Sequence, residues 1–342
     1  MKKLLNTLFV TSEDIYLSLD GENVVANRDH EIVARYPLHT LQSIVTFSYA
    51  GASPALMGKC TFDGIGLTFC TPRGKFLARA SGENDGNVLL RRQQYRIADD
   101  PNQSCRVARS MVFGKIYNCR QSLERTRRDH TLSVGNSLDA ASEKLKLALR
   151  AVSEETNLDS LRGAEGAAAK LYFDCFDSLI LQNKDSFKFE GRNRRPPTDP
   201  INALLNFAYS LLANDCASAL ESVGLDAYVG FMHRDRPGRT SLALDLMEEL
   251  RPCIAERFVL TLVNNRVLSK KDFERQASGA VYMTDNARRS FLRSWQDKKQ
   301  EKLTHPFLGE KLQWGLIPYV QALLLARFIR GDMDAYPPFL WK

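Results

Sequence analysis

The segment SCRVARSMVFGKIYNCRQSLERTRRD, residues 104–129, decides the fold class because its apolar residues recur at the period of a helix. Val107, Met111 and Ile116 fit a spacing of about 3.6 residues better than the spacing of about 2 expected of a half-buried strand. We expect further helices at 137–153, 158–184, 200–222, 241–258, 270–277, 285–299 and 310–331. In the third of these, Asp199 is suited to the N-cap and Pro200 to the first turn.

Residues 4–80 have a different pattern, in which short apolar runs alternate with turn residues and therefore predict strands. Residues 15–28, IYLSLDGENVVANR, alternate around Asp20-Gly21, which is typical of a β-hairpin. One helix interrupts the strands near 53–64, with Ser53 as its N-cap. We therefore predict an α+β fold. Its parts are a small β-rich domain at 1–90, a linker at 91–104 and a larger, mostly α-helical domain at 105–342.

The composition argues against several classes of protein. No apolar run reaches the roughly 18 residues of a membrane helix, and we expect no signal peptide, because the start of the chain lacks a full apolar segment and a small-residue cleavage site. The seven cysteines form no CxxC pair, which argues against a zinc ribbon and a disulfide framework. We expect buried free thiols in a reducing cytoplasm.

The charge of the chain favours an anionic partner, because 47 lysines and arginines outnumber 40 aspartates and glutamates and give a net charge of +7. Arginine dominates four basic clusters, at 91–96, 120–128, 191–197 and 233–239, and its planar guanidinium suits phosphate oxygens. A solvated surface is the alternative for each cluster taken alone. The candidate contacts to a nucleic-acid backbone are Arg192, Arg194, Arg195, Arg234, Arg236 and Arg239.

Three segments hold acids or a histidine in unusual settings. They are LRGAEGAAAKLYF (161–173) with Glu165, YVGFMHRDRPGRTS (228–241) with His233, and SLALDLMEELRP (241–252) with Asp245 and Glu248. A lone carboxylate is costly to bury, and the small residues around Glu165 predict close approach of another element. Asp245 and Glu248 lie one helical turn apart, so their charges repel unless a cation intervenes.

Each of these residues also has a structural alternative. Glu165 can pair with Arg162, three residues earlier, and His233 can be a hydrogen-bonded structural residue. Asp245 can stabilise the start of a helix capped by Ser241, and Glu249 can be solvated. Spacing along the chain does not show that the three segments meet. If they do, two carboxylates and an imidazole make a site for Mg²⁺ or Mn²⁺ beside arginines, an arrangement suited to phosphodiester chemistry.

Three motifs, in this order and spacing, resemble the CRISPR adaptation integrase family, the nucleases that insert new spacers into CRISPR arrays. The motifs are LRGAEGAAAKLYF (161–173), PPTDPINALLNFAYSLL (196–212) and GLDAYVGFMHRDRPGRTSLALDLMEELRP (224–252). The resemblance extends over nearly the whole chain and is closest to the branch that accompanies the I-C subtype. It implies a metal-dependent DNA endonuclease and integrase, in which the 3′-hydroxyl of a captured fragment attacks a phosphodiester of the repeat.

The resemblance also implies the roles of individual residues. Glu165, His233 and Glu248 match the family's metal ligands, and Asp245 matches an aspartate that lies close to the metal and completes the catalytic set. Tyr209 is a further candidate, as a hydrogen-bond donor near the site or as a core residue. The implied cofactor is Mg²⁺ or Mn²⁺.

The partners implied by the resemblance are DNA, a second copy of the chain held through the β-rich domain, a dimer of a small ferredoxin-like protein and an iron–sulfur nuclease of the adaptation module. No cysteine quartet is present, so an iron–sulfur cluster is expected to belong to the partner. Two other functions stay open. They are a non-catalytic DNA-binding scaffold, and an RNase or junction nuclease that uses the same metal chemistry.

Overall fold

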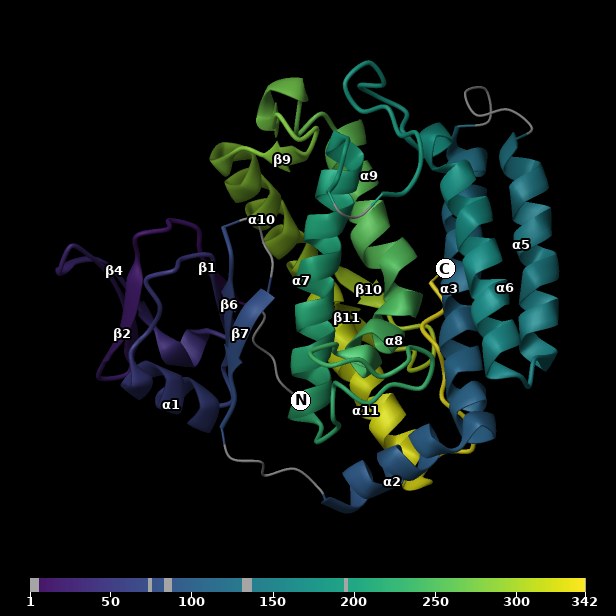
Figure 1. Ribbon diagram of the computed structural model, residues 1–342, viewed down its shortest axis with the longest axis horizontal. Coiled ribbons are helices and arrows are strands. Elements are labelled where there is room, and N and C mark those ends of the chain that lie inside the picture. Colours follow the sequence, from purple (N-terminus) through teal and green to yellow (C-terminus); the bar gives the residue numbers. More distant parts are fainter. Residues whose placement is uncertain (1–5, 73–75, 83–87, 131–136, 194–195, 342) are drawn as a thin grey trace. The chain divides into compact units, whose positions relative to one another are not determined.

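The computed structural model describes residues 6–72, 76–82, 88–130, 137–193 and 196–341. The chain divides into two compact units, which are described separately (Figure 1). The first unit comprises Met1–Asp85 and Asp285–Glu301, and the second comprises Gly86–Thr284 and Lys302–Lys342. The α+β class predicted from the sequence is confirmed, with strands concentrated in the first unit and helices in the second.

The first unit contains two small sheets. One has the strand order β1-β5-β6-β7, in which β7 alone is antiparallel to its neighbour. Its strands are β1 (Thr7–Val10), β5 (Ser43–Thr46), β6 (Gly66–Cys70) and β7 (Phe76–Ala80). The other is an antiparallel sheet of β2 (Tyr16–Asp20), β3 (Asn23–Arg28) and β4 (Glu31–Pro37). Between them lies a core whose fully buried members include Leu17, Val24, Leu38, Ile44, Leu56 and Leu67.

The turn signals of this unit form as predicted. Asp20 pairs with Asn23 across the hairpin, and Gly21 has φ of 56°, a left-handed conformation that costs glycine little. Helix α1 (Pro54–Phe62) begins after Ser53, whose side chain accepts a hydrogen bond from the backbone N–H of Leu56. A 3-10 turn, η1 (Leu38–Thr40), and helix α10 (Asp285–Gln300) complete the unit.

The second unit is a helical assembly with two short hairpins. Its α-helices are α2 (Val88–Asp99), α3 (Pro101–Asp129), α5 (Ser137–Glu154), α6 (Leu158–Asp174), α7 (Pro200–Ser222), α8 (Ser241–Leu250), α9 (Arg257–Asn264) and α11 (Ile317–Arg330). A π-helix, η3 (Arg251–Glu256), joins α8 to α9, and the 3-10 turns are η2 (Phe176–Leu179), η4 (Lys270–Asp272) and η5 (Trp314–Leu316). The hairpins are β8 (Phe273–Arg275) with β9 (Val281–Met283), and β10 (Lys302–Thr304) with β11 (Lys311–Gln313).

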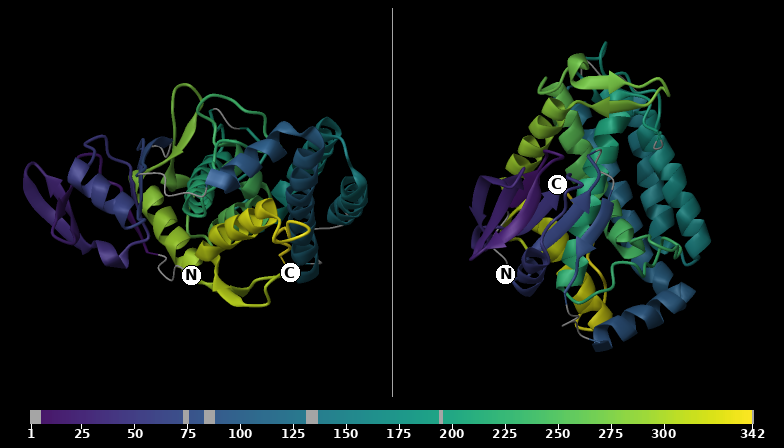
Figure 2. Two further views of the ribbon diagram at one scale, coloured as in Figure 1. Left: turned by 90° about the horizontal axis from the view of Figure 1, so that it is seen from below. Right: turned by 60° about the vertical axis from the view of Figure 1, so that its left-hand side comes forward.

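Helix α3 is the central element of this unit. It packs against α5 and α6 on one side and against α8 and η3 on another, so it connects the segments that hold the candidate acids (Figure 1 and Figure 2). Its start is fixed by Asp100, whose carboxylate accepts hydrogen bonds from the backbone N–H groups of Asn102 and Gln103. Val107, Met111 and the other apolar residues that predicted the helix are buried.

Several predicted boundaries differ from the structure. Residues 91–104, predicted as a linker, lie in α2 and the first turn of α3, and residues 285–299, predicted within the helical domain, belong to the first unit. Residues 270–277 form η4 and β8 in place of a helix, because Gly279 has φ of 81° and allows a tight turn back to β9. The helix predicted at 241–258 changes to a π-helix where Pro252 lacks the N–H that an α-helix would use.

Two predictions from composition concern cysteines and membranes. All seven cysteines lie in described residues as free thiols, and six of them are buried, as expected. Among the helices of the described ranges, none combines the length and apolar character needed to cross a bilayer.

Candidate metal centre

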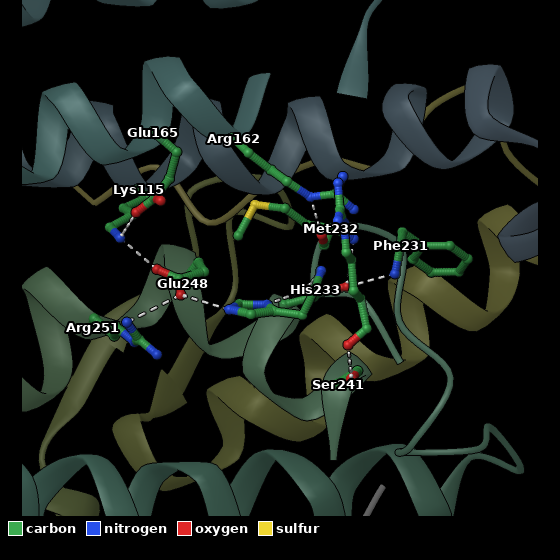
Figure 3. A network of polar contacts seen from close by, with 11 residues as sticks. Lys115, Arg162, Glu165, Phe231, Met232, His233, Ser241, Glu248 and Arg251 are labelled. Carbon is green, nitrogen blue, oxygen red and sulfur yellow. Dashed lines mark hydrogen bonds and ion pairs between the residues drawn. The ribbon is translucent and has the colours of Figure 1, made fainter. Parts of the chain in front are cut away.

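The three segments singled out in the sequence meet on one side of α3, and a lysine of α3 lies between them (Figure 3). Glu165 extends from α6, Glu248 from α8, and His233 from the loop 223–240 that precedes α8. The Nε2 atom of His233 lies 3.8 Å from Oε1 of Glu248. Lys115 Nζ contacts Oε1 of Glu165 and lies 2.6 Å from Oε2 of Glu248.

Asp245 fixes the position of the histidine. Its buried carboxylate accepts backbone hydrogen bonds from Phe231, Met232 and His233 at 2.6, 2.9 and 3.0 Å. The same carboxylate lies 2.5 Å from His233 Nδ1, and because a carboxylate only accepts, Nδ1 carries a proton. When His233 is neutral, its lone pair is therefore on Nε2, the atom directed toward Glu248.

This loop can approach α8 because residue 230 is glycine. A Cβ atom at Gly230 would lie 2.8 Å from Oδ2 of Asp245 and 2.9 Å from the backbone of Ser241. Thr240, not Ser241, is the N-cap of α8, and it makes no side-chain capping bond. The start of α8 is instead held by the loop. The Asp245 carboxylate accepts hydrogen bonds from three backbone N–H groups of the loop rather than from the helix end.

The pairing of Glu165 differs from the alternative raised by the sequence. Arg162 donates from Nε to the carbonyl of Met232 at 2.7 Å and from a terminal nitrogen to Asp159 at 2.6 Å, so it holds the loop against α6. Glu165 pairs with Lys115, whose side chain is only 7% exposed. The two glycines next to Glu165 do not serve close packing, because a Cβ at Gly163 or Gly166 would meet nothing within 4 Å.

Glu248 is held in its charged form. Burial by itself would raise its pKa, but the charges of Arg251 and Lys115 outweigh burial and lower the pKa to about 2. Arg251 lies 3.0 Å from Oε1 of Glu248. Lys115 is likewise held charged, since the carboxylates of Glu248 and Glu165 raise its pKa against the opposing effect of burial.

The residues fit a divalent cation by their chemistry. Within the described ranges, no three His, Cys, Asp or Glu side chains are arranged to hold an ion as they stand, because Lys115 lies between the two carboxylates. However, the lone pair of His233 is directed at Oε1 of Glu248, which is also an acceptor. Two acceptors that face each other are favourable when a cation lies between them, and this donor set suits Mg²⁺ or Mn²⁺.

Comparison with known proteins identifies the family. Residues 8–297 match the profile of the family described as CRISPR associated protein Cas1. The chain is 49% identical to a protein of Chlorobaculum tepidum named CRISPR-associated endonuclease Cas1 1, over the full length of both chains. The chain belongs to the Cas1 family.

Further similar proteins extend this comparison. A Rhodospirillum rubrum protein named CRISPR-associated endonuclease Cas1 2 is 49% identical over the full length of both chains. A Geobacter sulfurreducens protein named CRISPR-associated exonuclease Cas4/endonuclease Cas1 fusion is 36% identical over 98% of this chain and 60% of its own length.

Solved structures share the fold at low sequence identity. A Cas1 protein from Thermotoga maritima has a TM-score of 0.81 at 20% identity, covering 97% of this chain and 99% of its own. A casposase bound to integration product has a TM-score of 0.83 at 21% identity, covering 98% and 94%. A Cas6-RT-Cas1–Cas2 complex contains a chain with a TM-score of 0.80 at 22% identity, covering 100% of this chain and 36% of that one.

Tyr209 lies beside the site and is linked to it through an arginine. Its hydroxyl donates to Oε1 of Glu256, and the guanidinium carbon of Arg251 lies 5.0 Å from its ring centroid. Because Arg251 in turn pairs with Glu248, Tyr209 supports the site indirectly. The hydrogen bond predicted for its hydroxyl exists, but its acceptor is Glu256.

The candidate DNA-contacting arginines fall into three groups. Arg192 donates to side-chain oxygens of Asn202 and Asn206 at 2.6 Å, so the structure shows it packing residues 192–193 against α7. Arg194 and Arg195 lie outside the described residues. The remaining three belong to the loop that carries His233: Arg234 and Arg236 are exposed and Arg239 is half-buried.

Two important residues were not predicted from the sequence. Lys115 lies on the buried face of α3, four residues after Met111 and four before Cys119, and a lysine in such an apolar stripe is the signal that could have revealed it. Glu249, for which a solvated position was the alternative raised by the sequence, is completely buried. It accepts hydrogen bonds from Gln321 on α11, from the Tyr336 hydroxyl and from the backbone N–H of Phe339.

Proposed function

We propose that this chain is a metal-dependent DNA endonuclease and integrase of CRISPR adaptation. The observation that carries the proposal is the fixed imidazole of His233, which directs Nε2 toward Glu248 beside Glu165. Membership of the Cas1 family, with relatives named endonucleases over the full length of the chain, supports the proposed activity. The same three residues are the proposed ligands of Mg²⁺ or Mn²⁺.

The proposed reaction exchanges one phosphodiester for another. The 3′-hydroxyl of a captured fragment loses its proton and its oxygen forms a bond to a phosphorus of the repeat. The bond from that phosphorus to its neighbouring 3′-oxygen breaks, and the leaving oxygen takes up one proton, so one proton is lost and one is gained. A bound divalent ion would supply charge that polarises the phosphate and stabilises the leaving oxygen. The sequence contains no GxxxxGK[ST] motif, which is consistent with a reaction that needs no nucleotide triphosphate.

The protein residues have separate tasks in this reaction. Asp245 holds the proton of His233 at Nδ1 and leaves Nε2 available as a ligand. Arg251 keeps Glu248 ionised and in place. The exposed glycines 163 and 166 leave the surface next to Glu165 open, so a DNA backbone can approach without meeting side chains. Arg234, Arg236 and Arg239 are the proposed phosphate contacts, with Arg194 and Arg195 as further candidates.

The proposed partners follow from the relatives. The Geobacter sulfurreducens relative is a fusion with a Cas4 exonuclease, and a similar fold occurs in a complex with Cas2. We propose that this chain acts as a homodimer with a Cas2-type ferredoxin-like dimer and with a separate Cas4-type iron–sulfur nuclease. The buried free cysteines of this chain offer no cluster site, so the iron belongs to that partner. The proposed I-C association rests on the motifs of residues 161–252.

An integration assay tests this function directly. A fluorescent fragment and a plasmid with leader and repeat are incubated with the protein, with the Cas2-type partner and with Mn²⁺. Glu165→Ala, His233→Ala and Glu248→Ala should each abolish strand transfer while DNA binding persists. Glu143→Ala, an exposed acid on α5, is the matched control and should retain activity. Near-normal transfer by His233→Ala across Mn²⁺ concentrations would mean that the site is elsewhere.

A non-catalytic DNA-binding scaffold is the second candidate, and one observation favours it. Lys115 contacts both Glu165 and Glu248, and Arg251 pairs with Glu248, so these two cations balance the two carboxylate charges without a metal ion. A supercoiled plasmid incubated with Mn²⁺ or with EDTA separates the two functions. Nicking that depends on Mn²⁺ and disappears in Glu165→Ala supports the enzyme, whereas binding without nicking supports the scaffold.

A further inference from the structure

The side chain of Lys115 occupies the position between the two carboxylates that also suits a divalent cation. Its ammonium contacts Glu165 and lies 2.6 Å from Glu248, which come from different helices. We propose that Lys115 is an internal counter-ion that holds the site together without metal, and that it moves to Glu256 when a divalent cation binds. This inference rests on the metal dependence proposed above.

The charges at the site explain why the metal-free and the metal-bound protein each need one cation between Glu165 and Glu248. They also explain why two cations cannot occupy that position together. Without Lys115, Glu165 and Glu248 would face each other as two poorly solvated carboxylates, which is unfavourable. With Lys115 unmoved, an arriving divalent cation would meet an ammonium group that already contacts both carboxylates. Exchange of one cation for the other avoids both costs. Lys115 is also too deeply buried, at 7% side-chain exposure, to contact DNA from its present position.

Glu256 is a suitable acceptor for the displaced ammonium group. It lies on η3, which packs against α3, and it is 2% exposed. Tyr209 occupies its Oε1, and the Tyr172 hydroxyl also acts on this carboxylate, but Oε2 makes no hydrogen bond of normal geometry to any residue that the structure describes. Burial raises the pKa of Glu256, and the positive charge of Lys115 is among the influences that oppose this rise, so the two groups already interact. A long, flexible lysine side chain can change acceptor by rotation of its own bonds.

The neighbouring charges favour this direction of movement. Arg251 stays with Glu248 in either state, because its guanidinium is 3.0 Å from Oε1 and lies over the Tyr209 ring. The carboxylate of Glu256 would gain a hydrogen bond at Oε2, so the ammonium moves from two partners to a buried carboxylate rather than into an apolar core. Lys115 is therefore a positioning residue whose displacement sets metal affinity.

Binding of Mn²⁺ to the DNA-free protein, measured by titration calorimetry, is the test. Lys115→Met keeps an unbranched side chain, one atom shorter than lysine, and removes its charge. It should lower the melting temperature in EDTA and bind Mn²⁺ about tenfold more tightly than wild type, within the roughly 5–150-fold range typical of coupled sites. Glu256→Gln should instead bind Mn²⁺ about tenfold more weakly, because the displaced ammonium loses its charged acceptor. Lys170→Met, at an exposed ion pair on α6, is the control for charge removal and should match wild type.

The double variant isolates the movement of the lysine. Once Lys115 is methionine, Glu256→Gln should leave Mn²⁺ affinity unchanged, whereas a purely structural role of Glu256 predicts the same loss in both backgrounds. Equal or weaker Mn²⁺ binding by Lys115→Met, with normal binding by wild type, overturns this inference alone. Absence of Mn²⁺ binding by every variant, wild type included, overturns the proposed metal site as well. If Lys115→Met does not fold, the Glu256→Gln titration still decides, since unchanged affinity contradicts the proposal.

Discussion

At the scale of single residues, Asp245 shows how hydrogen bonds that stabilise a buried carboxylate can also position a neighbouring residue. Three backbone N–H groups and an imidazole Nδ1 surround its carboxylate, so a group that would be costly to bury is well hydrogen-bonded. The same bonds fix both the backbone and the ring of His233. A residue that only stabilised the end of α8 would not contact the loop.

Replacement of Asp245 by asparagine tests this role. The amide can accept on one oxygen only, and its NH₂ group would face donors, so we expect a loss of about 1–3 kcal/mol in the free energy of unfolding. The fixed tautomer of His233 is lost as well, and Mn²⁺ affinity and strand transfer should fall about 10–100-fold. Raising Mn²⁺ should restore part of the activity.

The control for Asp245→Asn is Asp100→Asn, at the N-cap of α3, because asparagine caps a helix about as well as aspartate. Unfolding in urea and titration with Mn²⁺ are measured for both variants. Wild-type activity of Asp245→Asn at limiting Mn²⁺ would reduce Asp245 to a structural residue. Activity lost completely and not restored by metal would indicate that Asp245 binds the metal directly.

Much of the candidate site could be predicted at this scale, but the residue that lies between the two acids, Lys115, could not. Glu165, His233 and Glu248 were identified from residue type and from a resemblance of short motifs, and the structure brings them to one place. Lys115 was missed because its partners lie on helices distant in the sequence, and no local spacing connects them. Arg162 has the favourable local spacing to Glu165, yet it pairs with Asp159, three residues earlier on the same helix, and with the carbonyl of Met232 in the loop.

At the scale of elements, long periodic helices were predictable and short hairpins were not. Helix α3 carries enough apolar residues for a period of about 3.6 to be recognised. The strands β8, β9, β10 and β11 have three residues each, too few to show an alternation. Their positions depend on turns and on packing, as at 270–277, where a helix was expected and η4 and β8 formed. The π-helix after α8 likewise depends on how Pro252 is accommodated.

Glu249 joins three elements, α8, α11 and the segment 336–339, and its buried carboxyl should make stability depend on pH. Burial raises its pKa from 4.5 to about 7, against the hydrogen bonds from Tyr336 and Gln321 that favour the charged form. Between these two values the folded protein binds more protons than the unfolded chain, so stability falls as pH rises from about 4.5 to 7 and is level above that. The decrease from this group is about 3 kcal/mol as an order of magnitude.

Urea unfolding in EDTA at about pH 5 and about pH 7.5, for wild type and Glu249→Gln, measures this contribution. The glutamine stays neutral, so the variant should lack the part of the decline that Glu249 causes. Burial lowers the pKa of His305, which contributes in the opposite direction in both proteins and cancels in the comparison. An identical decline in wild type and variant would show that Glu249 does not titrate in this range.

At the scale of the whole molecule, the net charge of +7 matters through where it lies. The loop 223–240 carries His233 and also Arg234, Arg236 and Arg239, so the segment that contributes to the proposed metal site also carries basic residues. Arg234 and Asp159 form an exposed pair at 3.1 Å, which is worth little in water and is easily exchanged for a phosphate. This surface can therefore bind DNA without a change in the fold.

Replacing these three arginines by glutamine tests whether the basic surface of the loop binds DNA. Each arginine bound to a phosphate releases condensed counterions, so the slope of log K against log salt should fall by about 0.9 for each phosphate-binding arginine removed, up to about 2.7 for all three. Duplexes of different sequence should be affected about equally, because the backbone carries no sequence information. The control replaces Arg28 and Arg35, which lie in the first unit and pair with Asp14 and Asp20. Because it removes two charges and the loop variant removes three, the change of slope is compared per arginine removed. Each of those changes removes the same charge from the protein but no proposed phosphate-binding group, so the slope should stay near that of wild type. An equal change of slope per arginine removed in the loop and control variants would assign the effect to net charge and leave the loop as a solvated surface.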